Sequence, residues 1–477
     1  MSAGPKRAVV LGGGIAGLAA CHRLIEGARE RNLPLEVLLV EASPRFGGAI
    51  ETERRAGCLL EKGPDCFLST KPEGIALCRE LGLESRLVGT RPENRRSFLL
   101  RRGRLIPVPQ GFYLLAPFSL LPFLASPIFS PLGKLRMALD LVIPRRREGG
   151  DETLASFVRR RLGREALDRM AQPMVAGIYS ADPEELSLEA TMPQFLEMER
   201  EDRSIILALR RRMGAAREGG SASGPRYGLF LTLDAGMGAL VDALLGRLPA
   251  ASLRPRARAV SLRREGGGWR VGVEGEGELE ADAVCAALPA PPAARLLRGV
   301  SPRLGALLEE VPCGSVATLN LIFRREQVAH PLDGMGFVVP AAEGRSLVAC
   351  SFSSSKFAGR APAGKALLRA FVGGAHGEEV LGLPDGDLTG RVMADLRLIL
   401  GIRGEPEEAS LQRYPGAMPR YRLGHLGRVR SMEEEAGRLP GFALAGSTYR
   451  GVGIPDCVAS AGAAARRLLE GLAAPVP

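Results

Sequence analysis

One short segment near the start of the chain constrains the fold more than any other part of the sequence. Residues 8–11, AVVL, form an apolar run typical of a buried strand, and Gly12, Gly14 and Gly17 follow in a G-x-G-x-x-G arrangement. Residues 18–25 have helical spacing, and a second apolar run at 37–40 ends in Glu41. This order of strand, glycine turn, helix, strand and acidic residue predicts a βαβ unit that binds a dinucleotide.

Each glycine of this turn has its own physical role. Gly12 permits the tight turn, Gly14 lets the backbone approach a pyrophosphate, and Gly17 brings the helix against the strand. The helix N-terminus stabilises phosphate charge, and Glu41 can accept a hydrogen bond from a ribose hydroxyl. A glycine-rich turn without a ligand is the alternative interpretation. The predicted cofactor-binding residues of this unit are Gly12, Gly13, Gly14, Ile15, Ala16, Gly17, Glu41 and Ala42.

Length and composition bound the remaining possibilities. A chain of 477 residues is too long for one hydrophobic core, so we expect two or three domains. The net charge of +11 comes from arginine, with only six lysines, and the single Trp and six Tyr do not cluster with basic residues. Proteins that bind nucleic acid usually combine basic patches with aromatic side chains, so no nucleic-acid partner is predicted.

The cysteines and histidines give no sign of a metal site. The eight cysteines form no CxxC pair, and neither they nor the four histidines have metal-ligand spacing, so no metal is predicted. The first apolar run leads directly into the glycine turn instead of a secretory signal, which predicts a reducing, cytoplasmic location.

The C-terminal part of the chain has a second strand–turn–helix pattern. FALAG at 442–446 reads as a short strand ending in Gly446, and residues 458–472 have helical spacing. Such a turn exposes backbone N–H groups that can meet an electron-rich ring edge. A plain αβ unit is the alternative.

The residues after Glu41 carry a family resemblance. SPRFGG completes an E-x-x-x-R-x-G-G pattern that resembles FAD enzymes of the flavin amine oxidase superfamily. The resemblance implies FAD as the cofactor, with the C-terminal segment returning beneath the flavin. No second complete G-x-G-x-x-G follows, so we expect molecular oxygen, or a quinone, as the electron acceptor and not a nicotinamide. The further cofactor-binding residues that this resemblance implies are Arg45, Gly47, Gly48, Ala49, Gly63, Pro64, Asp65, Cys66, Val260, Tyr414, Gly446, Val452, Gly453 and Ile454.

Seven short motifs in order along the chain narrow the resemblance to the FAD-dependent porphyrinogen oxidases of haem biosynthesis. They are EKGPDCFL (61–68), AGIYSADPEELS (176–187), MEREDRSIIL (198–207), GMGFVVP (334–340), FVGG (371–374), MPRYRLGHL (418–426) and YRGVGIPDC (449–457). The chain departs from the family pattern at Ser180-Ala181, where Ala-Gly is usual, and at Asp202, where His is usual. The resemblance implies oxidation of protoporphyrinogen IX to protoporphyrin IX by oxygen, which we favour, with coproporphyrinogen III as the alternative.

The substrate class implies the chemistry of its pocket. A porphyrinogen is a broad apolar ring with propionates, so its pocket needs apolar walls and a few cations. By resemblance, Val338 and Phe371 sandwich the ring and Gly177 faces its reacting side; core packing is the alternative. The candidate cations are Lys71, Arg95 and Arg96, and surface charge is the alternative for each. Because Ser97 stands where many relatives have Arg, either Arg96 shifts to the carboxylate or this contact is lost.

No catalytic side chain is predicted, because the flavin itself does the chemistry. We expect His425 to be a structural partner and not a base. Two other functions stay open. An amine oxidase would use an aromatic pair such as Tyr414 and Tyr449, and a non-enzymatic FAD-binding protein would use none of these features.

The predicted fold class is α/β (α+β overall), with three parts. A discontinuous Rossmann-like FAD-binding domain is expected from residues 1–97, 227–299 and 406–477, and a helical membrane-binding subdomain from 98–226. Residues 300–405 are expected to form a mixed-sheet substrate-binding domain, with strands at 317–323, 337–339, 347–352 and 367–372.

A long apolar stretch bears on location. Residues 105–133 carry no charge but contain six prolines, which disfavour a continuous transmembrane helix. We expect short helical pieces attached to one leaflet, peripheral on the inner face of the cell membrane, beside basic residues that meet anionic headgroups. A homodimer is left open. The residues expected at the lipid interface are Phe112, Leu120, Leu121, Phe123 and Phe129.

Overall fold

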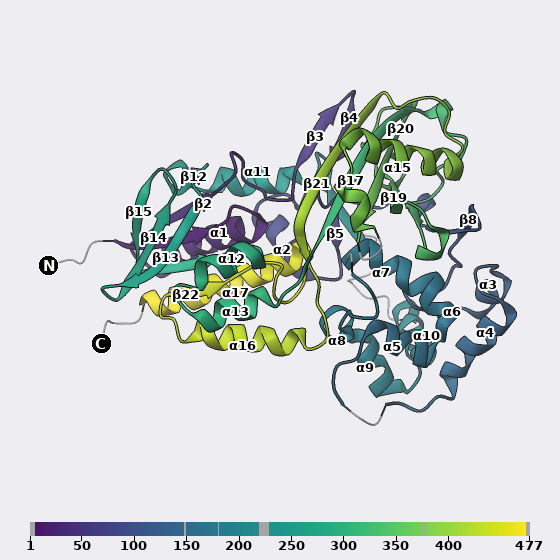
Figure 1. The fold of residues 1–477 in the computed structure, drawn as a ribbon, viewed down its shortest axis with the longest axis horizontal. Coiled ribbons are helices and arrows are strands. Elements are labelled where there is room, and N and C mark those ends of the chain that lie inside the picture. Colours follow the sequence, from purple (N-terminus) through teal and green to yellow (C-terminus); the bar gives the residue numbers. More distant parts are fainter. Residues whose placement is uncertain (1–4, 147–148, 180, 219–228, 375–376, 474–477) are drawn as a thin grey trace.

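The computed structural model describes residues 5–146, 149–179, 181–218, 229–374 and 377–473. A five-stranded parallel sheet of order β12-β2-β1-β16-β22 builds the part that holds both chain ends (Figure 1). The strands β1, β2, β16 and β22 carry buried apolar runs, as expected for a parallel sheet that is covered on both faces. Their bounds are β1 (Lys6–Leu11), β2 (Leu35–Glu41), β12 (Leu253–Pro255), β16 (Ala283–Ala286) and β22 (Phe442–Leu444).

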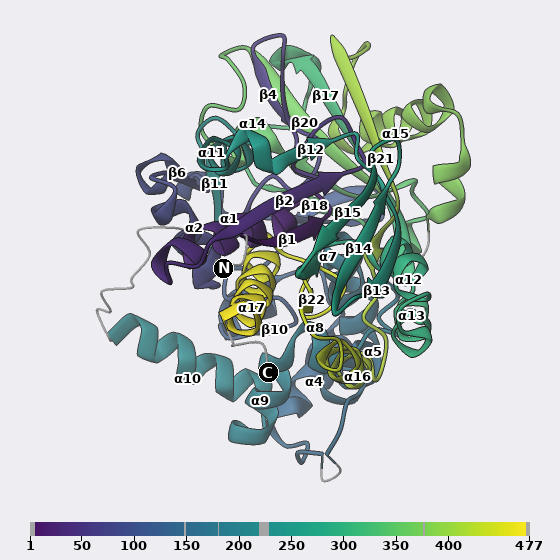
Figure 2. The same cartoon turned by 90° about the vertical axis from the view of Figure 1, so that its left-hand side faces the viewer.

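Alternate residues of β1 point to opposite faces of this sheet. Ala8 and Val10 pack against α1 (Ile15–Glu30), α2 (Pro72–Glu80), α11 (Gly238–Arg247) and α17 (Ile454–Ala473). Val9 and Leu11 pack against α12 (Ala290–Leu297), α13 (Pro302–Glu309), α16 (His425–Gly437) and a small antiparallel sheet. That small sheet comprises β13 (Ala259–Glu265), β14 (Gly268–Val273) and β15 (Gly277–Ala281), and Figure 2 shows α17 beside α1.

A seven-stranded mixed sheet builds the second part of the molecule, with order β21-β17-β20-β19-β18-β7-β8. The four strands expected between residues 300 and 405 are confirmed as β17 (Cys313–Arg324), β18 (Gly336–Val338), β19 (Leu347–Phe352) and β20 (Lys365–Gly373). The sheet also takes in β7 (Phe98–Arg101), β8 (Arg104–Pro107) and β21 (Glu408–Pro419), which lie outside that range. The division into three domains stays a prediction. Helix α15 (Asp385–Leu400) covers one face of the sheet.

Short elements connect the two large sheets. The hairpin β3 (Thr52–Arg55) and β4 (Cys58–Glu61) follows the βαβ unit along the chain. A three-stranded sheet joins β5 (Phe67–Leu68) and β6 (Leu87–Gly89) to β11 (Phe230–Leu233), which comes from much later in the chain. The short helix α14 (Ser353–Lys356) follows β19. The architecture is mixed α/β, as predicted.

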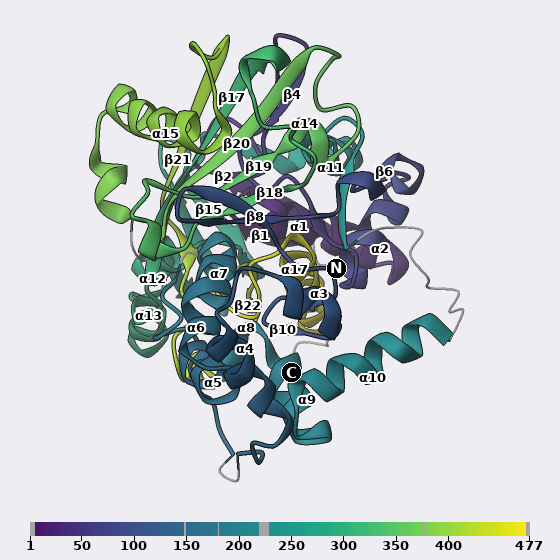
Figure 3. The same ribbon diagram turned by 90° about the vertical axis from the view of Figure 1, so that its right-hand side faces the viewer.

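Helices α3 to α10, here called the helical layer, form the third part of the molecule (Figure 3). They pack around their own core, which includes Phe157, Met170 and Phe195. Beside this core, Arg161 is completely buried and pairs with the equally buried Asp140 at 2.5 Å. The bounds are α3 (Leu120–Ala125), α4 (Pro131–Ala138), α5 (Leu154–Arg161), α6 (Arg164–Ala166), α7 (Gln172–Tyr179), α8 (Leu188–Thr191), α9 (Pro193–Asp202) and α10 (Ile205–Glu218).

The proline-rich stretch 105–133 is broken into short pieces, as predicted. It contains β9 (Phe112–Tyr113), β10 (Ala116–Pro117), α3 and the start of α4. Across the described ranges, the molecule has no helix that combines the length and the apolar character needed to cross a bilayer.

The expectation for the aromatic residues of this stretch is wrong. Phe123 and Phe129 are only 4% and 2% exposed, and Phe112 is half-buried and stacked on Phe129 at 6.0 Å. The rings pack in the core of the helical layer, Phe123 from the inward face of α3, Phe129 from the segment between α3 and α4, and Phe112 from β9. Leu120 and Leu121 are exposed as expected, together with five other apolar side chains on or after the same two helices. We call this set the leucine patch: Leu120, Leu121, Leu124, Leu132, Leu135, Leu139 and Val142.

Candidate functional site

The two ends of the chain meet at one edge of the parallel sheet. Strands β1, β16 and β22 run in the same direction, so the glycine turn, Ala287 and Ala445 follow their carboxyl ends side by side. The Ala287 N–H donates to the carbonyl of Leu11 at 2.9 Å, and the Ala445 N–H donates to the carbonyl of Ala286 at 3.0 Å. Ligands of parallel α/β sheets bind at such an edge.

The glycine turn has the geometry that the sequence predicts. Gly12 has φ +99°, and a Cβ on Gly17 would lie 1.8 Å from the carbonyl oxygen of Gly12, so helix and turn are in direct contact. A Cβ on Gly14, in contrast, would find its nearest atom at 4.0 Å, at the Cα of Gly48. Gly14 is the N-cap of α1, and no side chain caps this helix. The free space beside uncapped helix N–H groups fits the pyrophosphate of a dinucleotide.

Glu41 faces this turn. Its Oε2 accepts from the Gly13 N–H at 2.7 Å, and its Oε1 accepts from the Ser43 N–H at 2.7 Å. A carboxylate has about four acceptor sites, so two remain for a ribose hydroxyl. Ala42, beside it, is exposed.

A second glycine loop lies against the first. The Arg45 guanidinium donates to the Gly48 carbonyl at 2.6 Å and pairs with Glu51 at 2.8 Å. A Cβ on Gly48 would lie 3.0 Å from the Cα of Gly14. Arg45 therefore closes the loop of Gly47, Gly48 and Ala49 and holds it beside the predicted pyrophosphate space.

Buried polar side chains on one face of the seven-stranded sheet hold the segment that leads to Gly63. The Asn320 side-chain amide donates to the Glu61 carbonyl at 3.0 Å, and the Thr318 hydroxyl donates to the Lys62 carbonyl at 2.6 Å. The Arg369 guanidinium donates to the Gly63 carbonyl. Three consecutive carbonyls are thus bound by side chains that are at most 5% exposed. A Cβ on Gly63 would lie 1.7 Å from the Ala49 carbonyl, so this segment also touches the glycine loop.

The next residues form a charged cluster. Lys356 Nζ lies 2.8 Å from Asp65 Oδ2 and 3.4 Å from Cys66 Sγ. Although burial alone would raise the pKa of Asp65, the charges of Lys356 and Arg369 hold it well below its usual range. Burial, reinforced by Asp65, raises the pKa of the Cys66 thiol to about 12, so this thiol stays protonated. The cluster fixes the Pro64–Cys66 turn.

Lys356 and Arg369 are absent from the sequence prediction. Lys356 lies in a serine-rich segment without a motif. The sequence could have shown that Arg369 lies beside Phe371. It interrupts the apolar run ALLRAFV two residues before Phe371, and alternate residues of a strand share a face.

The two predicted ring-binding side chains occupy the same face of the seven-stranded sheet. Val338 pairs with Ala349, and Ala349 pairs with Phe371, so all three point to one side. Helix α7, which contains Gly177, lies against β18 and β19. The Arg369 guanidinium stacks on the Phe371 ring at 4.7 Å. An apolar surface therefore adjoins the segment that carries Gly63, while its contact with a substrate stays a prediction.

Buried polar atoms at this junction lack a hydrogen-bond partner among the described residues. They include Arg369 Nε, Asn320 Oδ1 and the Tyr414 hydroxyl. Burial raises the pKa of Tyr414 to about 12, so its hydroxyl is a neutral donor. Because buried polar groups are normally paired, these orphaned atoms fit the polar edge of a bound cofactor.

The predicted propionate cations are mostly engaged elsewhere. Lys71 Nζ lies 2.5 Å and 2.7 Å from the carboxylate oxygens of Asp456, and Arg96 pairs with Asp333 at 2.5 Å. Arg95 is exposed and has no partner within the described part of the chain. Their contacts with a substrate stay a prediction.

The remaining predicted cofactor residues lie around this edge. Val260 is 54% exposed and sits at a bulge of β13, where the register against β14 shifts between Ala259 and Ser261. The Gly446 N–H donates to Ser460 Oγ at 3.1 Å, and the Gly453 N–H donates to Asp456 Oδ2 at 3.1 Å. Val452 is half-buried, and Ile454 begins α17.

His425 is completely buried beneath the C-terminal loop. Its Nε2 lies 2.7 Å from the Tyr449 carbonyl, so Nε2 carries the proton in the neutral ring. Burial lowers the pKa of His425 to about 4. The arrangement agrees with a structural partner that stays uncharged.

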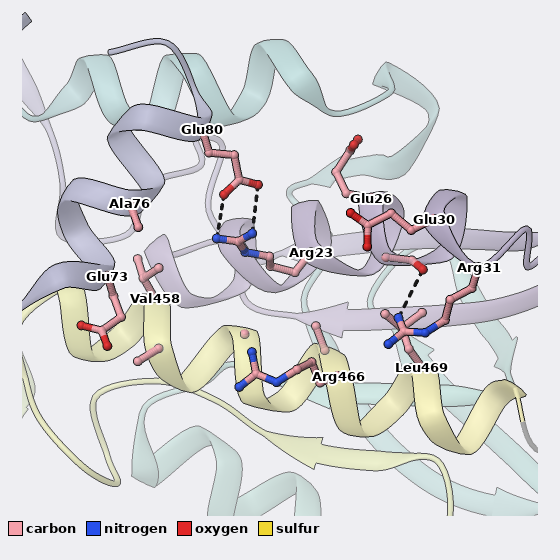
Figure 4. Close-up of a pocket in the computed structure, with 14 residues that line it drawn as sticks. Arg23, Glu26, Glu30, Arg31, Glu73, Ala76, Glu80, Val458, Arg466 and Leu469 are labelled. Atoms are coloured by element: carbon pink, nitrogen blue, oxygen red, sulfur yellow. Dashed lines mark hydrogen bonds and ion pairs between the residues drawn. The ribbon is translucent and has the colours of Figure 1, made fainter. Parts of the chain in front are cut away.

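A groove of about 540 Å³ lies between α1, α2 and α17 (Figure 4). Arg23 and Glu80 pair across it at 2.7 Å. No predicted cofactor- or substrate-binding residue lines it, so the sheet edge described above, and not this groove, is the candidate site.

Comparisons with known proteins agree on the family. The pattern of the flavin containing amine oxidoreductase family matches residues 15–469. The chain is 36% identical to a coproporphyrinogen III oxidase of Bacillus subtilis (96% of this chain, 97% of that one) and 31% identical to a protoporphyrinogen oxidase of Bos taurus (97% and 98%). A crystal structure from Exiguobacterium sp. 255-15, assigned as a protoporphyrinogen oxidase, superposes with a TM-score of 0.85 at 32% identity (98% and 99%).

The space at Gly14 gives a first prediction. A Gly14→Ala variant should fold normally, because its Cβ meets no atom closer than 4.0 Å, but should bind FAD at least about tenfold more weakly because the methyl group fills the pyrophosphate space. Isothermal titration of the apoprotein with FAD measures the change. Gly390→Ala, at another unobstructed glycine in α15, is the control and should bind FAD like the wild type. Wild-type affinity in Gly14→Ala would contradict this placement of the cofactor.

His425 gives a second prediction. Because its pKa is about 4 in the folded chain and 6.5 in the unfolded chain, the unfolded chain binds more protons between these values. The stabilisation is complete above pH 6.5 and is lost as the pH falls toward 4, by about 2 kcal/mol between pH 7 and pH 5. Arg428 and Arg450, which lower the pKa, and Asp151, which raises it, are the charged groups around the ring.

The measurement is urea unfolding of the wild type and His425→Gln at a series of pH values from 5 to 7.5. The free-energy difference between the two proteins should shrink as the pH falls. Parallel curves would show that His425 does not titrate as described.

Proposed function

The chain belongs to the porphyrinogen oxidases of the flavin-containing amine oxidoreductase family, and from this we propose that it oxidises a porphyrinogen to its porphyrin with molecular oxygen. The observation that carries the proposal is the apolar sheet face of Val338, Ala349 and Phe371, which adjoins the Gly63 segment through Arg369. A flat ring on this face would lie next to the cofactor. The oxidation removes six electrons and six protons from the ring, and three molecules of oxygen take them up as three of hydrogen peroxide.

FAD, when bound, supplies the hydride acceptor for this reaction. The protein positions the cofactor and the substrate relative to each other. Arg45, Asn320, Thr318 and Arg369 hold the loops on which the cofactor would rest, and Phe371 and Val338 offer the ring a surface without competing hydrogen bonds. No described side chain has to act as a base in this scheme.

The sequence motifs favour protoporphyrinogen IX as the substrate. On the basis of the structure we propose coproporphyrinogen III instead. Coproporphyrinogen III has four propionates and needs more cations around its rim. Arg101 lies two residues after Leu99, which pairs with Val338, so Arg101 is on the ring-binding face. Burial, with repulsion from Arg169 and Arg102, lowers the pKa of Arg101. A crowded arginine of this kind is stabilised by an anion.

The higher identity to the Bacillus subtilis coproporphyrinogen III oxidase supports the same choice. Arg101 was not among the cations that the sequence analysis predicted to bind the substrate. The strand pattern FLLR contained the signal, because alternate residues share a face, but it did not show which face would meet the substrate.

The test compares both porphyrinogens by the fluorescence of the porphyrin formed. Wild-type kcat/KM should be higher for coproporphyrinogen III, with three hydrogen peroxide molecules released per porphyrin. Arg101→Met should raise KM for coproporphyrinogen about tenfold, the loss expected for one charged hydrogen bond, and affect protoporphyrinogen less. Arg391→Met, an equal loss of charge on exposed α15, is the control. A wild type that prefers protoporphyrinogen, or equal effects on both substrates, would contradict the choice of substrate, and absence of porphyrin with either would contradict the function.

We also propose that the leucine patch rests on a lipid surface. Leu121 and Leu132 are 82% and 78% exposed, on neighbouring helices that Lys134 joins through a 2.6 Å hydrogen bond to the Leu124 carbonyl. Arg145 and Arg146 follow the patch and are exposed, so anionic headgroups would find cations beside apolar side chains. This supports a peripheral protein at a membrane.

The prediction for the leucine patch is a loss of vesicle binding. Wild-type protein should sediment with vesicles of mixed neutral and anionic phospholipid, and a Leu121→Asp, Leu132→Asp double variant should stay in solution. The control is Leu398→Asp, which changes a leucine 69% exposed on α15 and should sediment like the wild type. If the wild type stays in solution with these vesicles, the membrane proposal fails.

A further inference from the structure

Tyr421 stands at a junction between the helical layer and the C-terminal loop, residues 447–453. Its side chain is 1% exposed. Its hydroxyl donates to the Ser447 carbonyl at 2.5 Å and accepts from the Gly451 N–H at 2.9 Å. One hydroxyl group thus bridges the two ends of the turn that leads to Gly453.

A second contact fixes the orientation of the Tyr421 ring. It stacks on the His425 imidazole with 4.0 Å between ring centroids and 15° between planes. His425 in turn bonds to the Tyr449 carbonyl, at the middle of the same turn. Two stacked rings therefore support the loop at three backbone positions, Ser447, Tyr449 and Gly451.

The backbone around Tyr421 faces the helical layer. The Ser187 N–H donates to the Tyr421 carbonyl at 2.7 Å, and the Leu423 N–H donates to the Glu185 carbonyl at 3.1 Å. The Arg422 guanidinium pairs with Glu185 at 2.8 Å. Residues 421–423 therefore bind residues 185–187 as a short bridge, while the Tyr421 ring packs in the core of the helical layer and its hydroxyl reaches the C-terminal loop.

We propose that Tyr421 is a positioning residue that sets the C-terminal loop for the flavin and couples this loop to the helical layer. The hydroxyl satisfies a carbonyl and an N–H that would otherwise be unpaired, so it selects one conformation of the turn. The loop begins three residues after β22, at the sheet edge where the glycine turn also lies. A change in the loop would therefore change the backbone that meets the cofactor.

The effect of FAD binding at the C-terminal loop on residues 185–187 can be measured. Since one residue holds both the loop and residues 185–187, ordering the loop with FAD also steadies the Ser187 N–H bond. The inference rests on the proposed placement of FAD at Val452, Gly453 and Ile454.

The experiment uses the full chain with Tyr421→Phe, which keeps the ring stack and removes only the hydroxyl. We expect FAD to bind about tenfold more weakly, as two lost hydrogen bonds imply. The visible absorption spectrum of bound FAD should also change. In wild-type protein, FAD should slow amide hydrogen exchange in peptides covering 447–453 and 185–188; in Tyr421→Phe the protection of 185–188 should be lost.

Tyr113→Phe is the matched control. Tyr113 lies in β9 with its ring against Phe195 of the helical layer, and its hydroxyl has no partner among the described residues. The affinity, spectrum and exchange of this variant should match the wild type. Wild-type affinity and unchanged exchange in Tyr421→Phe would overturn the inference. If that variant does not fold, the wild-type exchange still tests the coupling, and FAD that protects 447–453 without protecting 185–188 overturns it.

The same data separate this inference from the placement of the cofactor. FAD that binds the wild type but leaves 447–453 unprotected would show that the cofactor lies elsewhere. Protection of 447–453 that is equal in the wild type and Tyr421→Phe would leave the placement intact and reject the role of Tyr421.

Discussion

The hydrogen-bond ladder that joins β1 to β2 and β16 is the constraint on which the rest of the structure depends. Because β22 adds to the same ladder, the first and the last strands of the chain end at one edge. Each strand then passes through glycine-rich backbone into a helix, α1 or α17, whose N-terminal N–H groups have no partners within the helix. An anion-binding edge follows from this ladder without any charged side chain.

The seven-stranded sheet helps to build the site through side-chain hydrogen bonds instead of a backbone ladder. Its face toward the site carries Thr318, Asn320 and Arg369, which are buried and bound to three carbonyls in a row. Burying such groups unpaired would cost free energy, so the sheet and the segment 61–63 can pack in only one register. The same face then continues with Phe371, Ala349 and Val338 and becomes apolar. One sheet surface thus both positions the segment 61–63 and carries the apolar side chains on which the proposed substrate binding rests.

The helical layer meets these two sheets through few but specific bonds. Its interior is stabilised by the buried pair of Arg161 and Asp140 and by the rings of Phe123 and Phe129. Toward the site it presents α7 and residues 185–187, and toward solvent it presents the leucine patch. The exposed leucines on the face away from the site are the basis of the proposed membrane attachment, which would suit a sparingly soluble substrate.

Local periodicity and short ordered motifs were enough to predict the βαβ unit, the tight turn at Gly12, the close approach at Gly17, the strands between residues 300 and 405 and the family. Tertiary structure decided which polar groups were already occupied. Lys71 and Arg96 look like free cations in the sequence, yet each meets a carboxylate 385 or 237 positions away along the chain. Phe123 and Phe129 look like membrane contacts in the sequence, because an apolar stretch does not show which of its side chains face the core and which face outward. For Arg101 and Arg369 the strand pattern shows which residues share a face, but only long-range pairing shows what that face meets. The contacts of Tyr421 with Ser447 and Gly451 are also long-range, and no local pattern predicts them.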